Sequence, residues 1–352
     1  MTKFVKNSAL MMPIANNNLT QQKAPLKVVT IGGGTGTFPV VQALVQLGVE
    51  ITCIVAVSDS GGSSGRIRDE FGFQPVGDLR QSLAALARTP SQDWVQKLLL
   101  YRFSKGSGLK GHNLGNLILT ALQDMTDSTT QVLDVAKTVF HLTGRVLPIT
   151  DQAIQLKVEY EDGTNLIGEH HLDLPSAPDK RIAEISFIPN ARCTVEVYQA
   201  LTEADHIIIG PGDLFASLLA VLKVGGVDEA AQNSQAQIHY LLNLMTRRSQ
   251  TRGMTASDHL RWIEQSLGRA VDSVVVNVDK IPASLSATYA QEGESEVVND
   301  LINDQRAVLA PVLSVTKPSI HAYDQVPRSL LRHDPNKLMQ LFNRLLVDEK
   351  HD

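Results

Sequence analysis

Three glycine-bearing loops hold the residues of this sequence that are best suited to chemistry. They span 32–36, 58–65 and 210–212, and each follows a short β-branched or apolar run. Glycine lets the backbone approach an anion closely, and a helix that begins at such a loop adds free N–H groups and partial positive charge. One such loop is often only a tight turn between a strand and a helix. Three of them at one sheet edge predict a pocket for a phosphorylated ligand.

The first loop does not match the common nucleotide motifs. In the dinucleotide fingerprint GxGxxG, the third glycine would fall at Thr37 when counted from Gly32, and at Pro39 when counted from Gly34. The Walker A motif needs a lysine followed by serine or threonine, and none follows these glycines. The sequence therefore disfavours two functions, that of an NAD-dependent dehydrogenase and that of a P-loop ATPase.

Two aspartates lie near these loops in the sequence. Asp59 ends the second predicted strand, and Asp78 begins a later predicted helix. Carboxylates at a strand end can accept hydrogen bonds from ribose hydroxyls or hold Mg²⁺. Two alternatives stay open, because Asp59 can bond N–H groups of its own loop and Asp78 can cap the helix 79–87. We expect both carboxylates to be metal ligands. Three nearby arginines can form forks for a diphosphate, namely Arg66, Arg68 and Arg80.

The segment 109–116, LKGHNLGN, concentrates polar side chains directly before an apolar helix predicted over 117–122. Lys110, His112 and Asn113 are candidate ligand contacts, because together they can donate and accept hydrogen bonds. Asn113 can equally be only the N-cap of the helix. The ten histidines show no HExxH or similar paired spacing, so the sequence predicts no dedicated zinc site.

The elements that must position these loops alternate between strands and helices. Near-continuous apolar runs at 27–31, 51–57 and 206–209 are typical of parallel strands covered on both faces. The pattern predicts a three-layer α/β/α fold with a Rossmann-like, mostly parallel sheet. Further strands are predicted over 238–244 and 271–278, and helices over 38–47, 213–224, 257–267 and 335–346. Another predicted helix ends before Gly144, with Ser128 or Thr129 as its N-cap.

One stretch departs from this pattern. Residues 153–172 alternate polar and apolar positions around Asp162-Gly163, which predicts a β-hairpin. We interpret residues 151–174 as an excursion from a single domain over 26–348. Residues 1–25 contain only a short apolar patch followed by asparagines, which favours a disordered tail over a signal peptide.

The composition of the 352-residue chain excludes several protein classes. Lysine plus arginine number 32 and aspartate plus glutamate 37, so the net charge of −5 disfavours a nucleic-acid coat. Cys53 and Cys193 rule out a disulfide scaffold and a thiolate zinc site, and favour the reducing cytoplasm. The best apolar run, 214–222, is about half of the roughly 18 residues that a membrane span needs, so no membrane span is predicted.

Six segments in this order resemble the YvcK branch of the CofD-like family: IGGGTGTFPVVQAL, VAVSDSGGSSGRIRDEFG, PVGDLRQSLAALA, LKGHNLGNLILTAL, HIIIGPGDLFASLL and TASDHL. The resemblance extends from about Lys27 to Leu346. It implies a cytoplasmic bacterial gluconeogenesis factor that is needed for normal cell shape on gluconeogenic carbon sources. It also implies binding of a UDP-sugar such as UDP-N-acetylglucosamine. The related 2-phospho-L-lactate transferase binds a guanosine diphospho-lactate and uses Mg²⁺.

The resemblance also implies roles for particular residues. Asp59, beside Ser60, and Asp78 match aspartates that the transferase branch places near its acceptor and metal. Tyr289 and Arg332 match a tyrosine and an arginine that grip the UDP-sugar. The two loops that would hold the nucleotide contain Gly33, Gly34, Thr35, Gly36 and Thr37, and Gly210, Pro211, Gly212 and Asp213.

The chain departs from the family pattern in two places. The family usually has GPGSLYTS where this chain has GPGDLFAS over 210–217, and NLMTQPGET where it has NLMTRRSQT over 243–251. The first change brings the acidic Asp213 close to a bound phosphate. Our hypothesis is that the Arg247-Arg248 pair compensates for this charge.

Two functions from different classes remain. The favoured one is a non-catalytic regulator that binds a nucleotide sugar, forms a homo-oligomer and acts on a protein partner in envelope synthesis. The alternative is a Mg²⁺-dependent transferase that cleaves a nucleoside diphosphate ester. The sequence assigns no catalytic residue.

Overall fold

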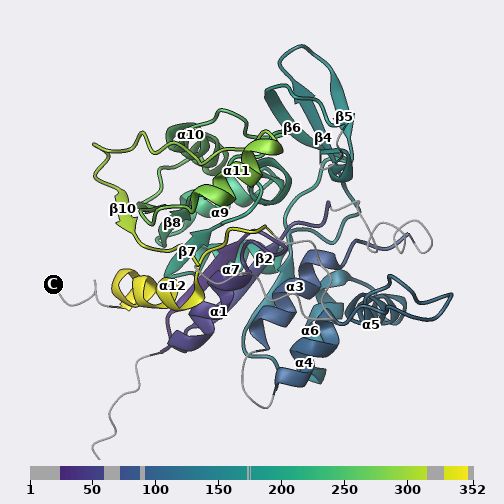
Figure 1. Cartoon of the computed structure of the whole chain (residues 1–352). Helices are drawn as coiled ribbons and strands as arrows, with labels where there is room; N and C mark the ends of the chain where they lie inside the picture. The colour runs from purple at the N-terminus through teal and green to yellow at the C-terminus, as the bar shows by residue number, and fades with distance from the viewer. Residues whose placement is uncertain are drawn as a thin grey trace, which may run out of the picture.

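Figure 1 shows a computed structural model of the chain, which describes residues 24–58, 72–87, 92–172, 174, 176–314 and 329–347. The tail predicted over 1–25 and the loop predicted over 58–65 lie mostly outside these residues. Asp59, Ser60, Arg66 and Arg68 lie outside them too, so their proposed roles stay predictions.

A seven-stranded sheet forms the centre of the fold (Figure 1). Every neighbouring pair of strands in it is parallel, which confirms the predicted fold class. The central strands are almost fully buried because helices cover both faces, whereas the edge strand β10 (Ala307–Ala310) is mostly not buried. Their order is β10 (Ala307–Ala310), β9 (Ser273–Asn277), β8 (Gln237–Leu241), β7 (His206–Ile209), β1 (Lys27–Ile31), β2 (Glu50–Val55) and β3 (Arg145–Pro148).

The chain leaves the middle of this sheet in two directions. It passes from β1 to β2 on one side, and from β7 to β8 on the other. Since such crossovers are right-handed, opposite directions put the connecting helices on opposite faces, which gives the three layers. One layer contains α1 (Phe38–Leu47), α3 (Gly77–Leu86) and α12 (Pro335–Phe342), with α4 (Asp93–Leu100), α5 (Leu114–Asp124) and α6 (Thr129–Val139) in the crossover to β3. The other contains α7 (Val195–Thr202), α8 (Leu219–Leu222), α9 (Val227–Asn233) and α10 (Ala256–Leu267), and α11 (Ala283–Gln291) follows β9.

A small antiparallel sheet projects from this body (Figure 1). Its central strand, β4 (Gln155–Tyr160), pairs with β5 (Asn165–Ile167) and β6 (Ile182–Ile188). The predicted hairpin is the β4–β5 pair, and Gly163 in its turn has a φ of +80°. The third strand was not predicted. A short 3-10 helix, Glu169–Leu172, lies between β5 and β6 in the chain.

Most local signals in the sequence act as predicted. Ser128 caps α6 by accepting a hydrogen bond from the Gln131 N–H, and Gly48 ends α1 with a φ of +67°. The expectation that Asp78 caps α3 is wrong, because the helix begins at Gly77, two residues earlier than predicted, with Val76 at the N-cap position. Asp78 therefore lies in the first helical turn. No helix in the described part of the chain is both long and apolar enough to cross a membrane.

A line of polar side chains crosses the sheet below the surface. His206 Nδ1 lies 3.1 Å from His239 Nε2, and His239 Nδ1 lies 2.8 Å from Ser273 Oγ. Both histidines are buried. Burial, with a smaller contribution from the neighbouring His206, lowers the pKa of His239 to about 4. Burial also lowers the pKa of His333, near the C-terminus, to about 4. Both side chains are therefore neutral at pH 7.

We expect the free energy of unfolding to fall as the pH drops from 6.5 toward 4. The folded-state pKa values of His239 and His333 lie below the unfolded value of 6.5, so the unfolded chain binds more protons in this window. The loss should be on the order of 3 kcal/mol for each histidine near pH 4. Urea unfolding at several pH values would measure it, and His239→Gln should flatten the profile. Equal stability at pH 7.5 and 4.5 would contradict the prediction.

Candidate functional site

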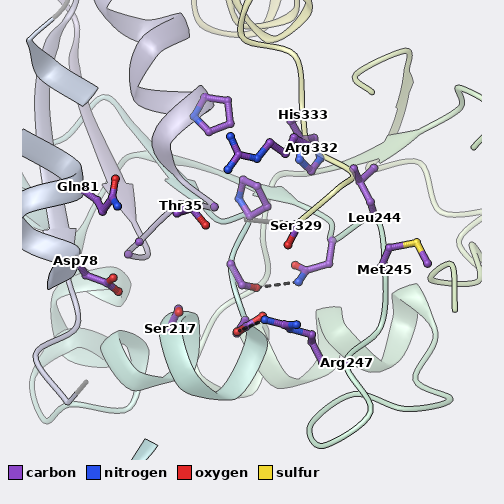
Figure 2. A pocket seen from close by; sticks show the side chains of 18 of the residues that line it. Thr35, Asp78, Gln81, Ser217, Leu244, Met245, Arg247, Ser329, Arg332 and His333 are labelled. Atoms are coloured by element: carbon purple, nitrogen blue, oxygen red, sulfur yellow. Dashed lines mark hydrogen bonds and ion pairs between the residues drawn. The ribbon is translucent and has the colours of Figure 1, made fainter. Parts of the chain in front are cut away.

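The two glycine loops that the structure describes meet at the carboxyl edge of the sheet. β1 and β7 are neighbours, but the chain leaves them in opposite directions, so the gap above them is a topological switch point. Open α/β sheets bind their ligands at such points. A cavity of about 380 Å³ lies here. Figure 2 shows Asp78 and Gln81 on one side of it, Leu244 and Met245 on the other, and Thr35 between them.

The loop after β1 forms the floor of the cavity with residues Gly33 to Gly36. Gly34 has a φ of +65°, a left-handed conformation that favours glycine. A Cβ on Gly36 would lie only 2.5 Å from the carbonyl oxygen of Pro211. The two loops therefore touch backbone to backbone, which only a glycine at position 36 allows.

Helix α1 begins directly after this loop, and Pro39 occupies its first turn. The missing N–H of a proline costs nothing there. The first N–H groups of a helix have no partner within the helix, so this end of α1 can hold an anion. Thr37 is buried below the loop, where its Cγ2 would lie 2.8 Å from a Cβ on Gly32. Its side chain therefore serves the packing of the loop.

The Asp78 carboxylate lies directly against the glycine loop. A Cβ on Gly33 would collide with its Oδ2 atom, and a Cβ on Gly34 would lie 2.9 Å from its Oδ1 atom. Asp78 reaches this position from the first turn of α3. The site thus places a negatively charged oxygen group beside the loop that is suited to hold phosphates.

Further polar groups continue this wall. Arg80 is 3% exposed and lines the cavity, and its Nη1 donates a hydrogen bond to the Leu99 carbonyl at 3.0 Å. Gly115 lets α5 approach α3, the helix that contains Arg80, since a Cβ on Gly115 would lie 2.8 Å from Arg80 Cδ. Gln81, Asn116 and Arg102 complete the wall, and Glu169 joins it from the small-sheet excursion.

The segment 109–116 contributes to the cavity indirectly. Lys110 is exposed, His112 is partly buried, and neither lines the cavity. Asn113 is fully buried and caps α5, because its side chain accepts the Asn116 N–H at 3.1 Å. The cap places Asn116 in the first helical turn, at the cavity. An asparagine three residues after a predicted N-cap was the signal that could have identified Asn116.

The opposite half of the cavity combines polar side chains with an apolar patch formed by Leu244, Met245 and Leu331. Leu244 and Met245 line it after the end of β8, where the chain turns away from the sheet earlier than predicted. Tyr289 of α11 lies below them in a small hydrophobic cluster with Leu331. Its hydroxyl accepts a hydrogen bond from the Leu331 N–H at 3.1 Å. These apolar side chains are suited to contact the faces of a flat ring.

Arg332 and His333 close the cavity from the C-terminal segment. In Figure 2 the Arg332 guanidinium reaches toward the side on which Thr35 lies. Two backbone hydrogen bonds of 2.8 Å fix this segment, from the Ser314 N–H to the Arg332 carbonyl and from the Asp334 N–H to the Val312 carbonyl. Asp334 itself caps α12, accepting N–H groups of the helix.

The two departures from the family pattern meet in the structure. Arg247 Nε lies 3.1 Å from Asp213 Oδ1, and Arg247 Nη2 lies 3.4 Å from Asp213 Oδ2. A third contact of 3.5 Å joins Arg247 Nη1 to Glu294 Oε1. Burial raises the pKa of Glu294, although Arg247 partly opposes this. Of the two arginines that we expected to compensate for the charge of Asp213, Arg247 pairs with it directly. Arg248 does not line the cavity.

The described residues contain no group of three or more histidine, cysteine, aspartate or glutamate side chains that could hold a metal ion. Magnesium, however, usually binds proteins through one or two carboxylates together with substrate phosphates. Asp78 beside the glycine loop fits that mode, because it offers a hard oxygen ligand where phosphates would lie. The predicted pairing of Asp78 with Asp59 stays a prediction.

The site residues named from the sequence fall into three groups. One group lines the cavity: Gly33, Gly34, Thr35, Gly36, Asp78, Pro211, Gly212, Asp213, Tyr289 and Arg332. A second group does not line it: Thr37, Lys110, His112, Asn113 and Gly210. Asp59 and Ser60 lie outside the described residues. Sequence reasoning did not select several lining residues, among them Asn116, Asn243, Glu294 and His333.

Comparisons with known proteins agree with this arrangement. The family model described as 2-phospho-L-lactate transferase CofD matches residues 28–316, which include both described glycine loops. The gluconeogenesis factor of Halalkalibacterium halodurans is 36% identical over 315 residues, which cover 89% of this chain and 94% of that protein. The gluconeogenesis factor of Bacillus subtilis is 34% identical over 327 residues, covering 92% and 98%. A crystal structure of a Bacillus halodurans protein is similar with a TM-score of 0.80 and 34% identity, covering 90% of this chain and 99% of that one.

Proposed function

Because the chain belongs to the CofD family, in its branch of bacterial gluconeogenesis factors, we propose that its cavity binds a nucleotide sugar of the UDP-N-acetylglucosamine type. The proposal gives each part of the ligand a wall of matching chemistry. The diphosphate lies on the glycine loop, the base against Leu244 and Met245, and the sugar beside Gln81 and Asn116. Arg332 bonds the phosphates from above with its planar fork of donors.

One observation carries this proposal. Two glycine loops from opposite sides of the switch point touch at Gly36 and Pro211, below a mostly polar cavity that has an apolar patch at Leu244 and Met245. Backbone N–H groups and a helix start suit the phosphates, and an apolar slot suits the base. A ligand with a base, a diphosphate and a sugar meets all three environments.

Isothermal titration calorimetry with UDP-N-acetylglucosamine tests the binding directly. UDP and N-acetylglucosamine, each alone, serve as controls for the two ends of the ligand. We expect the whole ligand to bind more tightly than either part. Equal binding by GDP-mannose and UDP-N-acetylglucosamine would contradict the assignment to uridine nucleotides, and no binding of any nucleotide would overturn the proposal.

In the cell, we propose a cytoplasmic regulatory role for the loaded protein. Binding of the nucleotide sugar stabilises one conformation, and that conformation acts on a protein partner in envelope synthesis. The protein thereby supports normal cell shape under gluconeogenic growth. A deletion strain that keeps its shape on gluconeogenic carbon sources would contradict this role.

Asp78 favours a second candidate function, a Mg²⁺-dependent transferase that cleaves a nucleoside diphosphate ester. Its carboxylate lies against the loop proposed to hold the phosphates, where a bound Mg²⁺ would supply charge neutralisation for the leaving phosphate. Incubation with UDP-sugars or GDP-esters and Mg²⁺, followed by analysis for UMP or GMP, separates this function from simple binding.

We expect Mg²⁺ to raise the nucleotide affinity of the wild-type protein, and Asp78→Asn to abolish that increase. The reason is that the variant keeps the shape of the side chain but loses its charge as a metal ligand. Calorimetry with and without Mg²⁺ measures the effect. Asp93→Asn is a matched control, since Asp93 also lies in the first turn of a helix but pairs with Lys97 at the surface. An undiminished Mg²⁺ dependence in Asp78→Asn would refute the role of Asp78.

A further inference from the structure

Arg332 lies on a short two-stranded strap at the edge of the cavity, which we define as residues 312–314 and 331–334. The two segments run antiparallel, with Leu313 opposite His333, and backbone hydrogen bonds join them. One of these bonds is accepted by the carbonyl of Arg332 itself. The backbone position of Arg332 is therefore set by the segment 312–314, which does not line the cavity.

The first segment of the strap is tied to the carboxyl end of β9. Asn277 Oδ1 accepts the Val312 N–H at 3.3 Å, and Asp279 Oδ2 accepts the Leu313 N–H at 3.0 Å. Asn277 is the last residue of β9, and Asp279 follows two residues later. These two side chains thus connect the strap to the central sheet, which is the most deeply buried part of the fold.

Lys337 closes this connection from the other side. It lies in the first turn of α12, which begins directly after the second segment of the strap. Its Nζ lies 2.8 Å from Asp279 Oδ2 and donates a hydrogen bond to the Leu313 carbonyl at 2.9 Å. We call these contacts of Asp279, Leu313 and Lys337 the latch. Its two charged side chains are only 27% and 32% exposed, so water screens their attraction less than it would at an open surface.

We propose that Asp279 and Lys337 are positioning residues, whose latch holds the strap so that the Arg332 guanidinium meets the phosphates of the ligand. The inference rests on the proposed function, because it concerns the same diphosphate. A two-pronged arginine contact depends on direction as well as charge, and hydrogen bonds weaken steeply when they are misaligned. A strap that is fixed before the ligand arrives also lowers the entropic cost of binding. Neither Asp279 nor Lys337 lines the cavity, so both act through Arg332.

The test is a double-mutant cycle of Lys337→Met and Arg332→Ala, measured by calorimetry with UDP-N-acetylglucosamine and with inorganic pyrophosphate. Methionine nearly keeps the length of the side chain but lacks the ammonium group. In the wild-type protein, Lys337→Met should weaken the binding of both probes by about threefold to tenfold. In the Arg332→Ala protein, the same change should alter the affinity by less than about twofold, because the group that the latch positions is absent.

Two further variants separate positioning from a general effect of losing a lysine. Lys337→Arg keeps the charge and has donors for both oxygen atoms of the latch, so it should restore most of the lost affinity. Lys27→Met is the matched control, because Lys27 Nζ also lies 2.8 Å from a carboxylate, that of Glu203. Lys27 begins β1, at the edge of the sheet opposite the cavity, so this variant should leave the affinity unchanged.

The outcomes distinguish the inference from the function on which it rests. Equal losses in the wild-type and Arg332→Ala proteins, or no loss in either, would overturn the positioning role while nucleotide-sugar binding stands. If only pyrophosphate binds and follows the expected cycle, the nucleotide assignment fails and the positioning role is supported.

Hydrogen exchange of the free protein follows the latch without any ligand. In Lys337→Met, exchange should be faster at 312–314 and 331–334 and unchanged at 32–36. Unchanged exchange in the strap would overturn the latch, whichever probe binds.

Discussion

Gly34→Val should fold and lose at least a hundredfold in affinity for UDP-N-acetylglucosamine. The φ of +65° at this position strains any branched side chain, at an expected cost of about 1–3 kcal/mol in the free energy of unfolding. The new Cβ also meets Asp78 Oδ1 at 2.9 Å, so the carboxylate must move. The valine would further fill the space proposed for a phosphate. Calorimetry and thermal unfolding of the same variant measure both effects.

Gly48→Val is the matched control for this variant. Gly48 has nearly the same φ, +67°, but a Cβ there meets nothing within 4 Å. Both variants should lose similar stability, and only Gly34→Val should lose binding. If Gly34→Val bound with wild-type affinity, the loop would serve only to pack a strand against a helix, and the phosphate site would lie elsewhere.

Arg332→Ala should weaken UDP-N-acetylglucosamine binding by about 1.5–3 kcal/mol, or roughly tenfold to 150-fold. The side chain lines the cavity across from the glycine loop, where its guanidinium can bond the phosphates. The segment that carries it is fixed by backbone hydrogen bonds to Val312 and Ser314, so the variant should keep its fold. Calorimetry measures the affinity, and circular dichroism checks the fold.

Arg332→Lys separates charge from geometry. Lysine keeps the positive charge but lacks the planar fork, so we expect an intermediate affinity. Tyr289→Phe completes the series, because it removes only the hydroxyl that accepts the Leu331 N–H and should lower affinity less than Arg332→Ala. Unchanged affinity in a folded Arg332→Ala variant would show that the arginine only packs over the cavity.

The central strands were predictable because their environment leaves a clear pattern. β1 and β7 are buried at every position except Lys27, and their runs of valine and isoleucine are typical of strands buried on both faces. The β10 strand is a short apolar run at an edge of the sheet that is mostly not buried, and β6 in the small sheet is buried only in part, so neither has the environment of a central strand. The sequence predicted the scaffold best where burial on both faces demanded it.

The site was predictable only in part, since its two kinds of residue leave different signals. Glycines after strands mark the loops directly, and both described loops lie at the cavity. Partners such as Arg247 and Glu294 are 47 positions apart and are brought together by the backbone hydrogen bond from the Thr246 N–H to the Ser295 carbonyl. The role of Asp78 as a helix cap was predicted wrongly because two more residues, Gly77 and Asp78, belong to the helix. Such choices depend on tertiary contacts that no local pattern records.

The backbone contact between Gly36 and Pro211 has a mechanical consequence for the proposed regulatory role, in which ligand binding stabilises one conformation. No side chain separates the two loops, so they form a stiff seam that cannot open like a hinge without losing direct packing. Any movement that reports ligand occupancy must therefore arise in the opposite wall, at Leu244, Leu331 and Arg332. Hydrogen exchange should slow on ligand binding in segments 242–247 and 329–333, and within 32–36 only at the N–H groups that bond the phosphates. The segments that contact the base would therefore change conformation when the ligand binds.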